Sequence, residues 1–165
     1  MPPDLILPGS DLEASRLLTR IWQGSYPQGG DFLKRRNFQV LALCAKELQT
    51  PEKYSGISIY LCPMNDAELT EDEAGRARQA ALRLADCWRR GDRLLITCAA
   101  GLNRSGLVSA LTIRQILDCT GEEAVEQVRS NRHRSLFNPS FVGYLTALGK
   151  PSAEKKTRRK APARR

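Results

Sequence analysis

The stretch LLITCAAGLNRSGLVSALTI, residues 94–113, constrains the fold more than any other part of this 165-residue chain. The apolar run over residues 93–98 predicts a buried strand. A turn of small residues follows it, and an apolar pattern with helical spacing then continues over residues 105–119. A strand that leads through a short loop into a helix is a building unit of parallel sheets. Cys98 stands at this junction.

Strand-like and helix-like segments alternate along the rest of the chain. Runs rich in branched or aromatic residues predict strands at 20–25, 38–44 and 57–62. Helical patterns are expected at 29–37, 70–92, 122–132 and 139–148. Two of these helices open with a Thr-x-x-Glu capping box, at Thr70 and at Thr120. The alternation predicts an α/β fold, with a central, mostly parallel sheet of about four to five strands flanked by helices.

The charge distribution divides the chain into one domain and two short ends. A chain of this length fits a single domain with its own core. Residues 154–165 hold seven Lys or Arg against one Glu, so this segment supplies +6 of the net charge of +8. We expect an N-terminal extension over residues 1–17, a folded domain over 18–150 and a basic, disordered tail over 151–165.

The basic run at 155–165 bears on possible partners. It would attract nucleic acid or an acidic partner with a salt-dependent strength, or it would only keep the chain soluble. No apolar window approaches the ~18 residues of a membrane-spanning helix, and the start of the chain lacks the pattern of a signal peptide. We therefore expect no transmembrane segment, and we expect a monomer.

The cysteine and histidine content limits the cellular compartment and the kind of catalytic chemistry that we expect. Five cysteines form no C-x-x-C pair, which favours a reducing, intracellular location. We expect a cytoplasmic protein, or a nuclear one if the source is eukaryotic. With a single histidine the sequence offers no cluster at metal-ligand spacing, so we expect no metal and no cofactor.

Cys98 opens a C-x5-R-S loop that suits a bound phosphate. The residues between Cys98 and Arg104 are Ala99, Ala100, Gly101, Leu102 and Asn103. In a strand-to-helix turn of this kind, backbone N–H groups and the helix N-terminus form a cradle for an anion, and Gly101 permits close approach. The planar fork of Arg104 binds two phosphate oxygens. The same positive field favours a thiolate, so Cys98 is a candidate nucleophile.

The competing interpretation of Cys98 is structural. A buried cysteine at the end of a strand commonly serves as a small apolar residue, and a bare C-x5-R match arises by chance in many chains. The context favours the phosphate loop. An apolar strand precedes the cysteine, a glycine lies within the loop, Ser105 follows the arginine and an apolar helix continues beyond.

The segment TCAAGLNRS, residues 97–105, resembles the signature His-Cys-x-x-Gly-x-x-Arg-Ser/Thr of the cysteine-dependent protein tyrosine phosphatase superfamily. Over roughly residues 18–148 the chain is similar to the compact dual-specificity type of that superfamily. Those enzymes carry their general acid, an aspartate, on a loop before the cysteine strand. Asp66, in CPMNDAELT, lies 32 residues before Cys98 and matches that position.

This resemblance implies a two-step hydrolysis of phosphomonoesters. The Cys98 thiolate attacks phosphorus to form a phosphocysteine, while Asp66 protonates the departing oxygen. Water then attacks with Asp66 as base, and the Ser105 hydroxyl helps the sulfur to leave. The amides of residues 99–104 and the Arg104 guanidinium hold the phosphate oxygens. The implied substrate is phosphotyrosine in proteins and, because the site should be shallow, phosphoserine and phosphothreonine as well.

One departure from the family pattern leaves alternatives open. Thr97 stands where the family has histidine, and this change is expected to slow turnover at neutral pH. It is the only support for a non-catalytic phosphate-binding module. The form GLNRSG also resembles the loop of relatives that act on RNA ends, so an RNA 5′-triphosphatase is the alternative enzyme.

Other charged residues near these motifs compete for roles. Glu68, Asp72 and Glu73 are alternatives to Asp66 as the proton donor. The arginines of the predicted helix over 122–132 and of the loop after it are more typical of a solvated face than of a substrate-binding surface; they are Arg129, Arg132 and Arg134.

Overall fold

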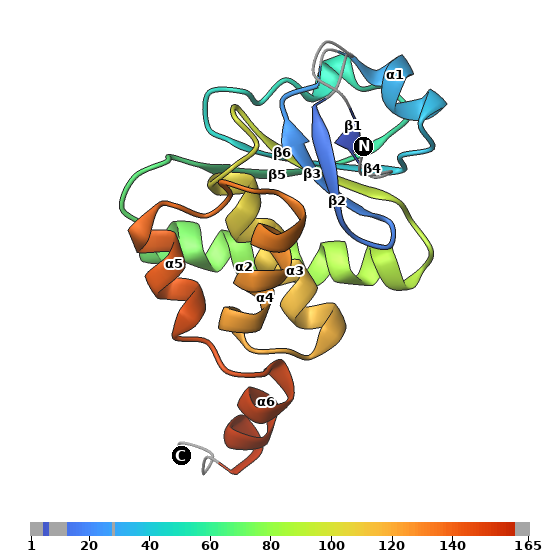
Figure 1. The fold of residues 1–165 in the computed structure, drawn as a ribbon. Coiled ribbons are helices and arrows are strands. Elements are labelled where there is room, and N and C mark those ends of the chain that lie inside the picture. Colours follow the sequence, from blue (N-terminus) through green and yellow to red (C-terminus); the bar gives the residue numbers. More distant parts are fainter. Residues whose placement is uncertain (1–4, 7–12, 28, 161–165) are drawn as a thin grey trace.

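The structure is a computed structural model that describes residues 5–6, 13–27 and 29–160. Its strands are β1 (Leu5–Ile6), β2 (Ala14–Leu18), β3 (Ile21–Ser25), β4 (Val40–Ala45), β5 (Ser58–Met64) and β6 (Leu94–Cys98). Its helices are α1 (Gly30–Arg35), the 3-10 turn η1 (Pro51–Lys53), α2 (Glu71–Arg89), α3 (Arg104–Leu117), α4 (Gly121–Asn131), α5 (Pro139–Thr146) and α6 (Pro151–Lys160). Figure 1 shows their arrangement.

The strands form one sheet in the order β1-β2-β3-β6-β4-β5. The pairs β3–β6, β6–β4 and β4–β5 are parallel, whereas β1–β2 and β2–β3 are antiparallel. The predicted α/β fold with a mostly parallel sheet is therefore confirmed, and each of the predicted strands is present. β1 and β2 extend the sheet beyond those strands, and β2 begins at Ala14, inside the segment 1–17 that we expected to lie outside the domain.

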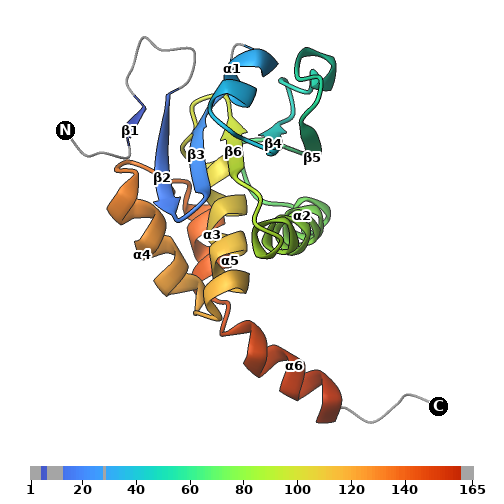
Figure 2. The same cartoon turned by 90° about the vertical axis from the view of Figure 1, so that its right-hand side faces the viewer.

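Helices cover both faces of the sheet. In Figures 1 and 2, α2, α3, α4 and α5 lie on one face and α1 lies on the other. Successive residues of β6 alternate between the two resulting cores. Ile96 and Cys98 pack into the core under the larger helical layer, whereas Leu95 packs into the smaller core with Leu33 of α1. This alternation explains why the central strands are apolar along their whole length.

The predicted helix starts are present with their capping hydrogen bonds. The Thr70 hydroxyl accepts from the backbone N–H of Glu73, whose carboxylate accepts from the backbone N–H of Thr70. Thr120 and Glu123 form the same reciprocal pair at α4. Each box satisfies two N–H groups that would otherwise lack a partner, so it fixes where its helix begins.

The tail differs from the expectation of disorder over its first ten residues, because residues 151–160 form α6. The helix extends away from the body of the molecule in Figure 2. Arg114, buried in α3, pairs with Glu154 and donates to the carbonyl of Gly149 over 2.7 Å. A buried cation that needs a carboxylate partner thus holds the start of the tail in place. Residues 161–165 lie outside the described part of the chain.

No helix in the described part of the chain is long and apolar enough to cross a membrane.

Candidate active site

Cys98 is the last residue of β6, which lies between β3 and β4 in the sheet. Its side chain is only 3% exposed. These strands are parallel, so their carboxyl ends meet at one edge of the sheet, where open α/β folds place their ligands. The loop 99–103 leads from this edge directly into α3, which begins at Arg104. The predicted strand–loop–helix unit is therefore present at the place in the sheet that favours a binding site.

The phosphate loop, residues 99–104, is packed tightly against the backbone of β3. Gly101 has φ +69°, and a Cβ at this position would meet Ser25 N at 2.5 Å and the carbonyl carbon of Gly24 still more closely. Gly24 in turn leaves no room for a side chain, because a Cβ there would clash with the carbonyl oxygen of Glu13. Both glycines are required by close backbone approach, and Gly101 also by its left-handed conformation.

Donors from distant segments of the chain, both side chains and backbone, hold the carbonyl groups of this loop. The carbonyl of Gly101 accepts from Gln23 Nε2 at 2.9 Å and from Arg132 Nε at 2.6 Å. The carbonyl of Leu102 accepts from the backbone N–H of Leu136 at 3.1 Å. Within the described residues, the backbone N–H groups of 99–103 have no acceptor. The loop thus keeps its donors unpaired, which is the condition for binding an anion.

Ser105 lies directly against the candidate nucleophile. The Cys98 Sγ and Ser105 Oγ atoms are 3.2 Å apart, and Ser105 is fully buried. When the sulfur is ionised, the hydroxyl can only donate to it, which stabilises a negative sulfur. Thr97, on the opposite face of β6, donates its hydroxyl to the carbonyl of Ala42 at 2.9 Å. Thr97 therefore ties β6 to β4, and in the described structure its hydroxyl does not hydrogen-bond to the loop.

Arg104 is oriented by a residue that the sequence analysis missed, Glu47. Arg104 Nη1 and Nη2 donate to the two carboxylate oxygens of Glu47 at 2.7 and 2.8 Å, and Nη1 also lies 3.2 Å from the carbonyl of Met64. This pair lowers the pKa of Glu47 to about 2, chiefly through the hydrogen bonds from Arg104, and raises the pKa of Arg104. The Nε–Nη2 edge of the guanidinium remains available for two phosphate oxygens.

Asp66 lies on the loop after β5, beside the phosphate loop. Its two carboxylate oxygens accept from Asn103 Nδ2 at 3.0 Å and from Asn138 Nδ2 at 2.8 Å. Asn103 also accepts, through Oδ1, from the backbone N–H groups of Phe137 and Asn138. The side chain of Asn103, to which we assigned no chemistry, therefore joins Asp66, its own loop and the segment before α5.

Asp66 differs in its contacts from the other three carboxylates that we considered as proton donors. Asp66 is the one among them that hydrogen-bonds to the phosphate loop in the described structure. Glu73 caps α2, and its carboxylate also accepts from the backbone N–H of Asn65 at 3.3 Å. Glu68 and Asp72 are exposed and make no recorded contact with the loop.

Arg132 differs from the solvated residue that we expected. It is 5% exposed, and besides Gly101 it contacts Ser15 Oγ at 3.1 Å and the Glu13 carboxylate at 3.0 Å. The helical pattern around Arg132 gave no sign of this role, because Gly101 lies 31 residues away along the chain and Ser15 and Glu13 lie 117 and 119 residues away. Arg129 is also bound to backbone, to the carbonyl of Leu136 at 2.6 Å.

No group of three or more His, Cys, Asp or Glu side chains that could hold a metal ion occurs among the residues described. All five cysteines are free thiols. Burial raises the pKa of Cys44 well above its ordinary value, and that of Cys62 to about 11, so neither is suited to act as a nucleophile.

Comparisons with known proteins agree with this geometry. The family described as "Dual specificity phosphatase, catalytic domain" matches residues 21–150. Human DUSP28 superimposes with a TM-score of 0.74 at 19% identity, over 92% of this chain and 99% of that one. A mouse putative dual specificity phosphatase, solved with zinc tungstate, has a TM-score of 0.76 at 17% identity, over 95% and 97%. PTPMT1, solved in complex with PI(5)P, gives 0.71 at 17%, over 90% and 99%.

At these identities the solved structures establish the fold alone. No curated protein matches the chain. The fold and the strand–loop–helix site define an α/β protein of the cysteine-based phosphatase type. The family match covers most of the chain, so this protein belongs to the dual specificity phosphatase catalytic domain family.

Proposed function

We propose that this protein hydrolyses phosphotyrosine, and also phosphoserine and phosphothreonine, in proteins through a phosphocysteine on Cys98, with Asp66 as the general acid. The observation that carries the proposal is the junction of β6 and α3. There, Cys98 Sγ lies 3.2 Å from Ser105 Oγ at a loop with unpaired N–H groups. A binding loop alone has no need of a cysteine at that place.

In the first step the Cys98 thiolate attacks phosphorus, and the bond from phosphorus to the substrate oxygen breaks. Asp66 gives its proton to that oxygen, so an alcohol or phenol leaves instead of an alkoxide. The amides of 99–104 and the free edge of Arg104 hold the remaining phosphate oxygens as charge moves between them. Water then attacks the phosphocysteine and passes a proton to Asp66, and phosphate leaves as the Ser105 hydroxyl supports the returning thiolate.

The position of Asp66 supports its role as the acid. Asn103 and Asn138 hold its carboxylate at the edge of the loop that also carries Cys98, so acid and nucleophile belong to one rigid unit. Each carboxylate oxygen accepts one amide hydrogen bond and keeps a second lone pair. That lone pair can carry the proton that is given up in the first step and taken back in the second.

Protein substrates are supported by the exposure of the site surroundings. Asp66, Ala99 and Ala100 are exposed, and Phe137, on the segment bound to Asn103, is 63% exposed. A site of this kind admits short phosphorylated side chains as well as phosphotyrosine. The basic run at 155–165 is proposed to recruit an acidic partner or nucleic acid, in addition to the substrate.

The test is phosphate release from para-nitrophenyl phosphate and from a phosphotyrosyl peptide in the presence of EDTA, at mildly acidic to mildly basic pH. Wild type, Cys98→Ser, Asp66→Asn and the control Glu68→Gln are compared. Cys98→Ser should abolish turnover. Asp66→Asn should lower turnover of phosphotyrosyl peptide by about 10²- to 10⁴-fold, and Glu68→Gln should not affect it. Full activity in Cys98→Ser would contradict the mechanism.

The substrate class is tested with the same proteins. We expect release from phosphotyrosyl, phosphoseryl and phosphothreonyl peptides to exceed release from 5′-triphosphate RNA and from phosphoinositide vesicles. Turnover confined to the RNA, and insensitive to Asp66→Asn, would instead establish an RNA 5′-triphosphatase. Vanadate binding without turnover of any of these substrates would identify a phosphate-binding module.

A further inference from the structure

The outer edge of β5 is an unpaired sheet edge. Among the residues that the structure describes, β5 is the last strand of the sheet and pairs with β4 alone. Ser58 N donates to Gln39 O at 2.9 Å, so Ser58 faces inward, and by the alternation of a strand Ile59 and Leu61 face outward with their N–H and C=O groups. Among the described residues these outward groups have no hydrogen-bond partner. Such an edge is a template for another strand.

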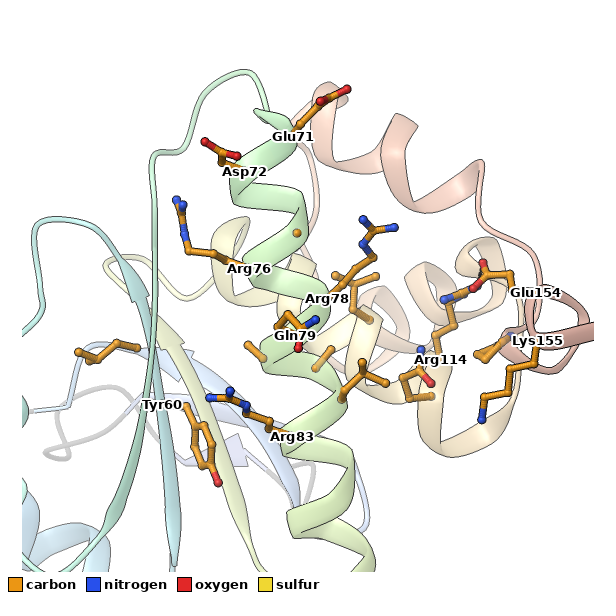
Figure 3. Close-up of a pocket in the computed structure, with 18 of the residues that line it drawn as sticks. Tyr60, Glu71, Asp72, Arg76, Arg78, Gln79, Arg83, Arg114, Glu154 and Lys155 are labelled. Carbon is orange, nitrogen blue, oxygen red and sulfur yellow. Dashed lines mark hydrogen bonds and ion pairs between the residues drawn. The ribbon is translucent and has the colours of Figure 1, made fainter. Parts of the chain in front are cut away.

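A groove runs along this edge. A cavity of about 930 Å³ lies along α2. The side of the cavity next to β5 is lined by Ile59, Tyr60 and Leu61. Figure 3 shows that Arg76 and Arg83 lie on the side of α2 that faces β5, whereas Arg78 points to the other side. No residue of the phosphate loop lines this cavity, so it is separate from the candidate active site.

The two faces of the edge differ in chemistry. Tyr60 and Cys62 point toward the helical layer, where Tyr60 Oη lies 3.3 Å from Cys87 Sγ of α2. Leu61 alternates with them and lies on the other face of the sheet, and it is 51% exposed. A strand added to β5 would therefore meet an apolar side chain on one face and the guanidinium groups of α2 on the other.

Two of the arginines beside the edge differ from the buried arginines of the molecule in their ion pairs. Arg104, Arg114 and Arg132 each pair with a glutamate. In the described part of the chain, neither Arg76 nor Arg83 forms an ion pair. Arg76 Nη2 lies 3.3 Å from the carbonyl of Pro63, which shows that the α2 side chains reach the edge of β5. Glu71 and Asp72 line the cavity at the start of α2, and Arg76 contributes, after hydrogen bonds from Thr70 and Asn65, to the lowered pKa of Glu73. Arg83 lies about three turns further along the helix from these acids, so its positive charge remains for a partner.

We infer that the β5–α2 groove binds an extended segment of a partner protein in which acidic and apolar residues alternate. The segment adds a strand to β5 through the backbone of Ile59 and Leu61. Its apolar residues lie against Leu61, and its carboxylates pair with Arg76 and Arg83. Proline at position 63 has no N–H to offer, so the pairing ends there, just before the loop that carries Asp66.

A second copy of this chain fits the edge less well. Pairing of β5 with β5 would bring Arg76 and Arg83 of both copies to one interface, where like charges repel. An acidic segment removes this repulsion and replaces it with attraction. The inference does not depend on the phosphatase reaction, because binding to this groove requires none of the residues of the phosphate loop.

The experiment uses a fluorescein-labelled peptide of alternating Glu and Val, with an alternating Lys and Val peptide as the matched control. Fluorescence anisotropy should show binding of the Glu peptide, weakening as salt is added, and no binding of the Lys peptide. Arg83→Glu should lower the affinity about tenfold. Arg35→Glu, which makes the same charge change on the exposed face of α1, should have no effect.

Backbone pairing is measured separately by amide hydrogen exchange. The N–H groups of Ile59 and Leu61 should become protected when the Glu peptide is added, and Arg83→Glu should retain wild-type thermal unfolding and para-nitrophenyl phosphate turnover. Equal binding of both peptides, binding unaffected by Arg83→Glu, or binding without protection at Ile59 and Leu61 would overturn the inference. Protection that rises with protein concentration in the absence of peptide would assign the edge to a second copy instead.

Discussion

Asn103 Nδ2 donates a hydrogen bond to Asp66 Oδ2 over 3.0 Å, so the phosphate loop itself positions the candidate general acid. The opposite end of the same side chain accepts from two backbone N–H groups before α5. Acid, loop and the α5 segment are thereby joined through one buried amide. The geometry of the acid depends on the loop being formed, and a change at Asn103 should affect proton transfer more than phosphate binding.

Asn103→Ala should lower kcat more for poor leaving groups than for good ones. A nitrophenolate leaves without a proton, whereas the alcohol of a phosphoserine needs one from Asp66. We expect the loss on phosphoseryl peptide to exceed the loss on para-nitrophenyl phosphate by about tenfold. Asn65→Ala, on the same loop as Asp66, is the control. An equal loss on both substrates would mean that Asn103 only maintains the fold.

Glu47→Gln should raise KM for phosphorylated substrates. The carboxylate holds Nη1 and Nη2 of Arg104 and leaves the Nε–Nη2 edge without a carboxylate on it. A neutral amide offers one acceptor oxygen in place of two charged ones, so the guanidinium is held less firmly in its orientation. Steady-state kinetics and vanadate affinity measure the effect, with Glu52→Gln as the control. A lower KM would show instead that Glu47 competes with phosphate for Arg104.

The same pair predicts a dependence of stability on pH. The pKa of Glu47 is lowered from about 4.5 to about 2, first by its hydrogen bonds from Arg104. A carboxylate with a lowered pKa contributes stability that is complete above its unfolded pKa and is lost as pH falls through the folded pKa. The stability difference between wild type and Glu47→Gln should therefore be constant near neutral pH and shrink between about pH 4.5 and 2. Denaturant unfolding at several pH values checks this.

Gly101→Ala should disrupt both folding and activity. The left-handed φ of +69° and the contact with the β3 backbone leave no room for a methyl group. We expect a loss of about 1–3 kcal/mol from backbone conformation alone, before the clash is counted. Gly143→Ala is the matched control, because an added Cβ in α5 meets nothing within 4 Å. That control should gain about 0.5–1 kcal/mol, and equal effects of the two substitutions would refute the packing argument.

Arg132→Met should destabilise the protein and slow the reaction together. The substitution keeps much of the side-chain volume but removes the donors to Gly101 and Ser15. The carbonyl of Gly101 then keeps only its bond from Gln23, and the buried Ser15 hydroxyl loses its bond from Arg132. Such a loss costs about 1–3 kcal/mol. Thermal unfolding and kcat should both fall, whereas Arg134→Met, at an exposed position, should change neither. A large loss of activity at unchanged stability would give Arg132 a direct role in binding substrate.

Local patterns were sufficient to locate the centre of the molecule. The apolar strand ending at Cys98, the loop after it and the capping boxes at Thr70 and Thr120 are all determined by residues close together in sequence, and all are present. The family signature and Asp66 added the mechanism. The roles of these residues in catalysis remain predictions.

The parts that the sequence analysis missed depend on contacts between distant segments. Glu47 lies three residues after the last predicted strand residue, Cys44, but only the order β3-β6-β4 brings it to Arg104. The sequence analysis left the order of the strands open, so the position of Glu47 beside Arg104 could not be predicted. Arg132 looked like a solvated helical residue because its partners lie in distant segments: Gly101 in the phosphate loop, and Ser15 and Glu13 on and just before β2. The mixed polar sequence of β2 gives no clear period.

The hairpin of β2 and β3 limits where the chain can be truncated and which substitutions its sequence can accept. The matched family region begins at residue 21, yet Glu13 and Ser15 bind Arg132, and the carbonyl of Glu13 covers Gly24. A fragment trimmed to the matched region would keep every residue of the signature and lose the support behind its loop. Substitutions in residues 13–18 should accordingly be accepted only together with changes at Arg132. Across related sequences, this short N-terminal segment and the position of Arg132, at the start of the loop after α4, should therefore vary as a pair.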